Sequence, residues 1–194
     1  QAGQSNIMSR LKSIGIQVEK NDPKIKKLLE EVKDREFIGY SYDGADASFE
    51  LLARRLMGEI PRYILINEYD VSVKKDNVGE IISHAKAHLE VDGEKILCEG
   101  QGNGPVNALD NAIRKNVNKL AKYSEYLKDL KLVDYKVRIL NTGTEAVTRV
   151  SIESTDSKGI NWFTIGVSTN IIDASFKALI DSLDYKLFKD NAPA

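Results

Sequence analysis

The sequence of 194 residues has a single cysteine, Cys98, and no hydrophobic run as long as a membrane-spanning helix. One cysteine excludes an internal disulfide, and its place in an apolar segment predicts a small buried side chain in a reducing compartment. Because a spanning helix needs about 18 or more apolar residues, neither a membrane span nor a signal peptide is predicted. Together these features indicate a cytoplasmic protein with no membrane partner.

The chain also lacks an excess of charge of either sign. It has 28 Lys and Arg against 29 Asp and Glu, which gives a net charge of −1. A nucleic-acid-binding domain is typically basic, with its cations gathered on one face. The one short basic cluster, Lys24 to Lys27, is followed by acidic residues at helical spacing, which is typical of a solvated helix face. No nucleic-acid partner is therefore predicted.

The motifs that carry chemistry are absent as well. The sequence has no cysteine pair, HExxH, P-loop or Gly-x-Ser-x-Gly element. His84 and His88 fall on one face of a predicted strand, where residues four apart are about 13 Å from each other. That spacing is too long for one metal ion, so we expect structural or solvent-facing histidines. No catalytic residue and no metal ligand is predicted in this chain.

What the sequence does contain is an internal repeat. The segment GQGNGPVNALDNAI at Gly100–Ile113 recurs as GVSTNIIDASFKAL at Gly166–Leu179. Three pairs are identical at that offset and three are conservative: Gly100/Gly166, Ala108/Ala174, Ala112/Ala178, Val106/Ile172, Asn107/Asp173 and Ile113/Leu179. The same offset aligns YDVSV, from Tyr69, with YKVRI, from Tyr135. A register kept over two separate segments predicts a duplicated unit.

Periodicity assigns elements to each copy. Alternation predicts strands at Tyr69–Val73, Ala85–Val91 and Ile96–Glu99, then a helix from Pro105 with the stripe Val106, Leu109, Ile113, Val117 and Leu120. The second copy repeats the order, with strands at Tyr135–Ile139, Thr148–Glu153 and Ile160–Ile165 and a helix at Ile171–Leu183. Residues 186–194 are expected to form a frayed tail.

Residues 1–60 have helical periodicity instead. Asp22 before Pro23 is a helix start signal, and a further helix fits Ala45–Met57. Three short helices bury little apolar area, so we expect this segment to pack against a part absent from the chain. The sequence thus predicts an α+β fold in which a helical subdomain, 1–60, precedes a domain, 61–194, of two pseudo-symmetric βββα units packed as an α/β sandwich.

The glycine-led loops allow two interpretations. They can be turns that only close a strand onto a helix. They can also form a pocket for a small anion such as an amino-acid carboxylate, because glycine allows close approach to the N–H groups of a helix start. For Tyr69 and Tyr135, repeat equivalence favours core positions over ligand contacts.

At these loops the sequence resembles the C-terminal regulatory domain of the 2-isopropylmalate synthase and citramalate synthase family. The matches are GQGNGPVNALDNAI and TIGVSTNIIDASFKALIDSLDYKL, with AGQSNI at Ala2–Ile7 and GYSYDGADASFELLARR at Gly39–Arg55 similar to the linker before that domain. The last of these is more similar to citramalate synthases. The resemblance covers nearly the whole chain.

This resemblance implies a fragment of an acyl-CoA-dependent enzyme. A TIM barrel of the parent chain, outside these 194 residues, would bind a divalent metal and catalyse the condensation of acetyl-CoA with pyruvate. The fragment itself would need no cofactor and would form a homodimer that binds isoleucine as a feedback inhibitor at the dimer interface. The implied effector residues are Gly102, Asn103, Gly104, Pro105, Val106, Asn107, Ser168, Thr169, Asn170, Ile171, Ile172 and Asp173.

Within that set, the family commonly has aspartate where this chain has Asn107, which leaves Asp173 as the partner of the effector's ammonium group. A helix-start carboxylate that complements the helix dipole is the other interpretation of Asp173. Two alternative functions stay open. One is the equivalent domain of a 2-isopropylmalate synthase, which senses leucine, and the other is a dimerisation module without a ligand.

Overall fold

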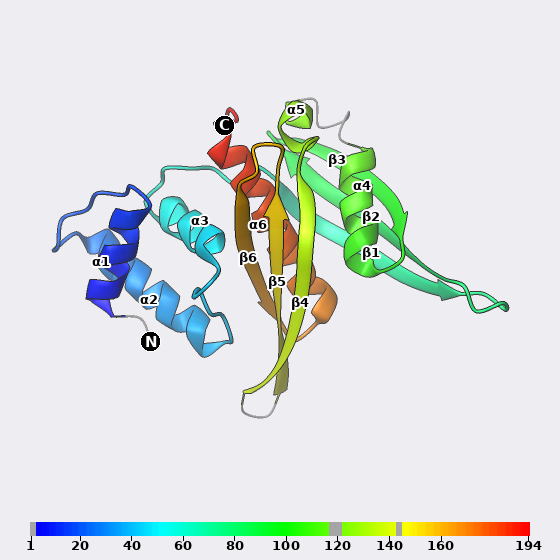
Figure 1. Ribbon diagram of the computed structural model, residues 1–194, viewed down its shortest axis with the longest axis horizontal. Coiled ribbons are helices and arrows are strands. Elements are labelled where there is room, and N and C mark those ends of the chain that lie inside the picture. The colour runs from blue at the N-terminus through cyan, green and yellow to red at the C-terminus, as the bar shows by residue number, and fades with distance from the viewer. Residues whose placement is uncertain (1–2, 117–121, 143–144) are drawn as a thin grey trace.

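A computed structural model describes residues 3–116, 122–142 and 145–194 (Figure 1). Three helices come first: α1 Gln4–Ser13, α2 Pro23–Phe37 and α3 Asp46–Leu56. The first unit follows as β1 Leu65–Lys75, β2 Ile81–Val91, β3 Glu94–Gly102 and α4 Pro105–Lys115. After the short helix α5, Ser124–Leu127, the second unit comprises β4 Lys131–Thr142, β5 Glu145–Thr155, β6 Asn161–Ser168 and α6 Ile171–Lys189. Val117 and Leu120, predicted for the α4 stripe, lie outside the described residues.

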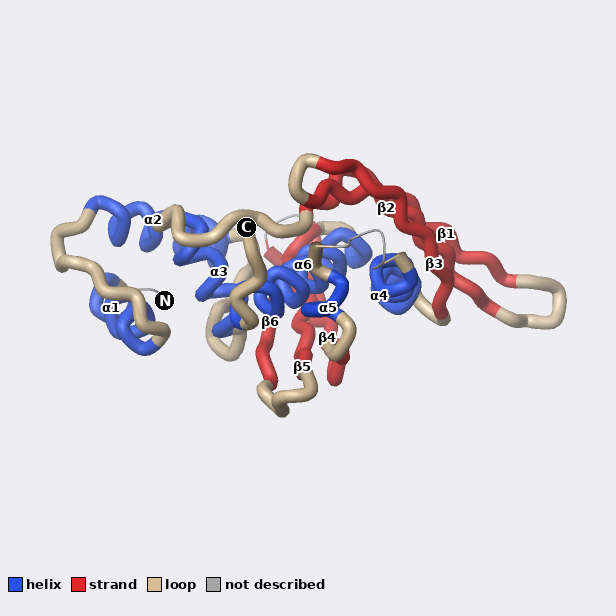
Figure 2. Tube along the Cα trace, turned by 90° about the horizontal axis from the view of Figure 1, so that it is seen from above, coloured by secondary structure: helices blue, strands red, loops and turns tan. Residues whose placement is uncertain are grey.

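The predicted fold class is confirmed. Two antiparallel three-stranded sheets form, ordered β1-β2-β3 and β4-β5-β6. Helix α4 packs on β3 and β2, α6 packs on β6 and β5, and the two helices contact each other. Figures 1 and 2 show the helices in a layer between the sheets. Each helix thereby covers mainly the two later strands of its own unit.

The duplication extends to irregular details. The first strand of each unit has a β-bulge at the same place, between Ile66 and Glu68 in β1 and between Leu132 and Asp134 in β4. A bulge shifts the register of a strand, so its repetition shows that the two units share strand geometry as well as sequence.

The core of each unit follows strict alternation in the central strand. In β2 the helix-facing side chains from Ser83 to Val91 are all buried, and those between them are mostly exposed. Cys98 of β3 pairs with Ala87 of β2 and is fully buried, as predicted. The helix-facing side of each central strand is therefore core.

The N-terminal helices share a second apolar cluster. Asp22 caps α2 through its side chain, which accepts a hydrogen bond from the Lys24 N–H at 2.9 Å. Helix α3 packs on α6 and β6, and Ile165 of β6 belongs to the helical cluster. The second unit therefore supplies at least part of the surface that covers this segment, and its packing against a part outside the chain stays a prediction. The domain boundary at residue 60 stays a prediction.

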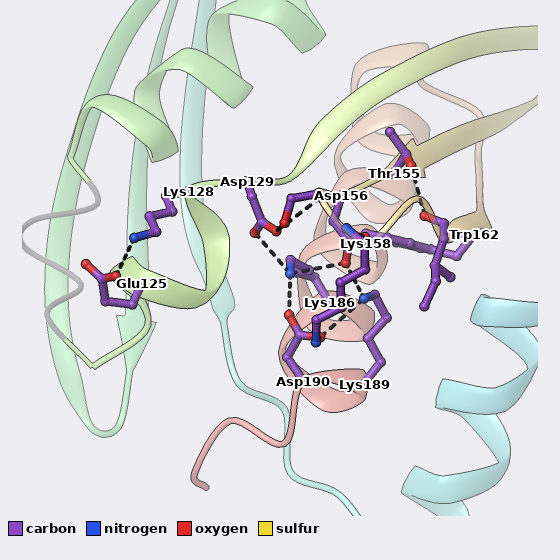
Figure 3. A network of polar contacts seen from close by, with 12 residues as sticks. Glu125, Lys128, Asp129, Thr155, Asp156, Lys158, Trp162, Lys186, Lys189 and Asp190 are labelled. Atoms are coloured by element: carbon purple, nitrogen blue, oxygen red, sulfur yellow. Dashed lines mark hydrogen bonds and ion pairs between the residues drawn. The ribbon is translucent and has the colours of Figure 1, made fainter.

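The frayed tail predicted at 186–194 is also wrong. Helix α6 continues to Lys189, and Lys186 is 1% exposed. Its ammonium nitrogen lies 3.0 Å from Asp129 and 3.3 Å from Asp156, and it also contacts Asp190 (Figure 3). A lysine near the end of the chain is typically exposed to solvent, which is why the sequence pattern suggested a frayed tail. Here three carboxylates neutralise the charge of Lys186, where α6 meets the α5–β4 link and the β5–β6 turn.

Candidate functional site

Gly100 and Gly166, the equivalent glycines of the repeat, lie beneath the helices α4 and α6. A Cβ at Gly100 would approach the backbone nitrogen of Ala112 to 2.4 Å, and one at Gly166 would approach the Ala174 carbonyl oxygen to 2.1 Å. Such distances are far inside van der Waals contact, so only glycine allows the strand and helix to pack this closely. At these two positions the repeat is explained by helix–sheet packing.

The first predicted loop, Gly102–Asn107, is held by its own asparagine. The Asn107 side-chain oxygen accepts a hydrogen bond from the Asn103 N–H at 3.2 Å and lies 3.4 Å from the Asn111 amide nitrogen. Gly104 is the N-cap residue of α4 and supplies no side-chain cap, and Pro105 follows at the first helical position. The N–H groups of a first turn have no partner inside the helix, so this N-terminus can receive an anion.

The second loop, Ser168–Asp173, differs at this point. The Asn170 side-chain oxygen accepts hydrogen bonds from the N–H groups of Ile172, at 2.8 Å, and Asp173, at 3.1 Å. Ser168 accepts a hydrogen bond from the Asn170 N–H at 3.1 Å, and Thr169 is exposed. The start of α6 is therefore capped by the protein itself, whereas the start of α4 is not.

Replacing Asn170 with alanine is expected to destabilise the chain by about 1 kcal/mol, because two N–H groups at the start of α6 lose their acceptor. Thermal unfolding of Asn170→Ala and of the matched Thr169→Ala variant measures this, since Thr169 precedes the cap and is exposed. Equal midpoints for the two variants would contradict the capping role.

Asp173 has partners from two elements. Its carboxylate accepts a hydrogen bond from the Tyr69 hydroxyl of β1 at 2.9 Å and lies 3.3 Å from the Lys177 ammonium. Burial raises its pKa, but the bond from Tyr69 and the charge of Lys177 outweigh that effect, so the pKa lies below the ordinary value. Burial and the neighbouring carboxylate raise the pKa of Tyr69 to about 12. Asp173 is thus an ionised carboxylate that joins the second unit to the first.

The expected core positions of Tyr69 and Tyr135 are wrong. Tyr69 is 37% exposed and Tyr135 is 41% exposed, because each lies on the outer strand that its own helix leaves uncovered. Tyr69 packs edge-to-face on Phe176 of α6, with ring centroids 4.4 Å apart. The Tyr135 hydroxyl instead lies 2.6 Å from the Ser175 hydroxyl.

Within the described residues, no hydrogen bond or ion pair connects the two predicted loops. One cavity, of about 950 Å³, is lined by only Asp173 of the twelve predicted residues. Its walls are α2, α3, the segment after α3, β1 and α6, with cationic side chains at Arg35, Arg55 and Arg62. Sequence reasoning missed this cleft because its walls come from distant segments with no shared motif.

Among the described residues, neither the histidines nor the cysteine belongs to a cluster of possible metal ligands. His84 and His88 are exposed, and His88 lies 3.2 Å from a carboxylate oxygen of Glu68. Among the described residues, no group of three or more His, Cys, Asp or Glu side chains could hold a metal ion. Over the same part of the chain, no helix combines the length and apolar character needed to cross a membrane.

Two βββα units that share a β-bulge and a closely packed glycine define a duplicated α+β domain, here preceded by a helical segment. The family model described as the LeuA allosteric (dimerisation) domain matches residues 43–187. The chain belongs to that family, which confirms the resemblance inferred from its motifs.

Curated relatives extend this similarity. The chain is 44% identical over 192 residues to an (R)-citramalate synthase of Aquifex aeolicus, a match covering 97% of this chain and 36% of the relative. It is 42% identical over 191 residues to the (R)-citramalate synthase of Geobacter sulfurreducens, covering 97% and 35%. A 2-isopropylmalate synthase of Clostridium acetobutylicum is 38% identical over 106 residues, covering 54% and 17%. The chain thus spans about a third of the length of these citramalate synthases.

Proposed function

We propose that this chain is the allosteric and dimerising part of a citramalate synthase and that isoleucine is its inhibitor. The citramalate synthase matches cover 97% of the chain, whereas the 2-isopropylmalate synthase match covers 54%. This difference in coverage supports the citramalate assignment over the leucine-sensing alternative. The condensation of acetyl-CoA with pyruvate, with its divalent metal, belongs in this proposal to a TIM barrel elsewhere in the parent protein.

The uncapped start of α4 carries the proposal of an effector site. An amino-acid carboxylate there would accept hydrogen bonds from the N–H groups of Val106 and Asn107, where Gly104 supplies no cap. Asp173 offers an ionised carboxylate for the ammonium group, since Tyr69 and Lys177 hold its pKa low. The half-buried Val106 and Ile172 and the more exposed Ile171 would contact a branched aliphatic side chain.

Thermal unfolding with isoleucine, leucine, valine or no ligand tests the assignment. Isoleucine at about 100 times its dissociation constant should stabilise the fold by roughly 2.7 kcal/mol. A rise of the midpoint with isoleucine alone supports the citramalate assignment, and a rise with leucine alone would transfer the chain to the 2-isopropylmalate synthases.

Asp173→Asn is expected to weaken isoleucine binding by about tenfold or more, because a charge-assisted hydrogen bond contributes about 1.5–3 kcal/mol. Calorimetric titration of the variant against Asp70→Asn provides a matched comparison, since Asp70 is exposed beside Tyr69 on β1. If Asp173→Asn binds isoleucine like the parent chain, Asp173 has no part in the site.

A dimerisation module without a ligand is the second candidate. Two observations favour it: Asn170 already occupies the N–H groups of the second loop, and close packing explains Gly100 and Gly166. The absence of a midpoint shift with each of the three amino acids, in a chain that is still dimeric, would select this candidate.

A further inference from the structure

The cleft of about 950 Å³ lies where the helical segment meets both βββα units. Helices α1 to α3 lie beside β6, and the chain after α3 runs past α6 to β1 (Figure 1). Sites for drug-sized molecules typically enclose about 300–1,000 Å³. The cleft is therefore large enough for a molecule bigger than a free amino acid.

The walls of the cleft are largely aliphatic. Leu56 of α3, Ile60 after it, Ile66 of β1 and Ile180 of α6 all line it. Leu56, Ile60 and Ile66 are only half-buried, so they present apolar surface to the cleft. A ligand with an aliphatic chain would remove this surface from water, which is favourable in proportion to the area covered.

Most carboxylates of the cleft already have a cation. Glu31 pairs with Arg35 at 2.9 Å, Asp173 with Lys177 at 3.3 Å, and Asp181 with Arg55 at 3.3 Å. The remaining carboxylate, Asp34, is exposed on α2. The paired groups neutralise one another, so they do not determine the charge of a ligand.

Arg62 is the cation that stays available. It lies between Ile60 and Ile64 in the segment after α3, lines the cleft and is exposed. Within the part of the chain that the structure describes, its guanidinium forms no hydrogen bond or ion pair. Burial raises the pKa of Asp181, and the charge of Arg62 is near enough to lower it in part. Arg62 is thus a free guanidinium beside an aliphatic wall, and Asp34 lies on another wall.

We propose that this cleft binds an aliphatic carboxylate, with its carboxylate on Arg62 and its chain against Ile60, Ile66 and Ile180. The planar guanidinium presents its N–H donors in a fork that matches the two oxygens of a carboxylate. Such a ligand would contact the helical segment and both units at once. The proposal does not depend on isoleucine binding, because Asp173 is the only predicted effector residue in these walls.

Calorimetric titration of the 194-residue chain with octanoate tests the site. One octanoate should bind per chain, and octanamide, which has the same chain without the charge, should bind at least about tenfold more weakly. Arg62→Gln should weaken octanoate binding by about tenfold, because a charge-assisted hydrogen bond is lost, and should leave octanamide binding unchanged. Its circular dichroism should match the parent, since Arg62 is exposed. Arg138→Gln is the matched control, because Arg138 is an exposed arginine of β4 outside the cleft.

The apolar wall has its own variant. Ile60→Ser should weaken octanoate and octanamide alike, by about fivefold or more, because aliphatic surface is removed from the cleft. Unchanged binding of both ligands in this variant would overturn the wall.

Four further results would overturn the site. They are no saturable octanoate binding, octanamide binding as tight as that of octanoate, Arg62→Gln binding octanoate like the parent, and an equal loss in Arg138→Gln. Displacement of octanoate by isoleucine would mean that the two ligands share one site, which also contradicts the proposal. A chain that binds octanoate and shows no midpoint shift with isoleucine keeps the cleft site while the proposed effector function fails.

Discussion

Gly166→Ala is expected to destabilise the chain by about 3 kcal/mol, at the upper end of the usual cost of overpacking a core. The new methyl group would lie 2.1 Å from the Ala174 carbonyl oxygen and 2.8 Å from the Ala178 backbone nitrogen. Both neighbours are backbone atoms of α6 and cannot rotate away, so the helix itself must move off β6. Thermal unfolding should show a midpoint lower by roughly 6–12 °C.

Gly104→Ser is the matched control for this variant. A Cβ at Gly104 meets nothing within 4 Å, and serine is a good N-cap residue. Its stability should stay within about 0.5 kcal/mol of the parent or rise. If Gly166→Ala unfolds at the parent's midpoint, close helix–strand packing does not explain the repeated glycine.

The order of strands and helices could be predicted because it depends on local signals. The alternation of β2, the Asp22-Pro23 helix start and the matching glycines all depend on neighbours close in sequence. Local periodicity is a property that a single sequence displays directly. For the same reason Cys98 was correctly predicted to be buried.

Features that depend on distant partners could not be predicted. The bond from Tyr69 to Asp173 crosses 104 residues and joins the two units, and no local pattern indicates it. The ordered end of α6 depends on Asp129 and Asp156, which reach Lys186 from separate loops. The burial of Tyr135 was predicted wrongly, because equivalent positions in a repeat do not reveal which elements pack over the strand. The twelve predicted loop residues stay a prediction.

A second buried ion cluster joins α6 to the N-terminal helices. Arg55 of α3 lies 3.3 Å from Asp181 and 2.8 Å from Asp184 of α6. Asp184 also accepts a hydrogen bond from the Ile64 N–H at 3.3 Å, just before β1. The Asp184 side chain is 1% exposed. One guanidinium therefore serves two carboxylates at the junction of three segments.

Because two buried carboxylates share one guanidinium, the stability of the fold is expected to depend on pH in an unusual direction. Burial raises the pKa of Asp184 to about 7, and the charge of Arg55 only partly offsets it while Asp181 adds to it. Between about pH 4 and pH 7 the folded chain then holds a proton that the unfolded chain has released, so stability falls as pH rises across that window. One such proton changes stability by at most about 1.4 kcal/mol per pH unit. The opposite holds for three carboxylates whose pKa values are lowered: Asp129, Asp156 and Asp190. Their contribution to the stability of the fold is lost only when the pH falls far enough to protonate them.

Arg55→Met is expected to cost about 3 kcal/mol or more at pH 8, because it leaves the buried Asp184 ionised without its cation. The loss should shrink at pH 5, where Asp184 binds a proton and needs no partner. Urea unfolding at the two pH values measures this, and Lys128→Met is the control, since its pair with Glu125 is exposed to solvent and contributes little to stability. An equal loss at both pH values would mean that Asp184 does not titrate in this window. Arg55 would then act through packing alone.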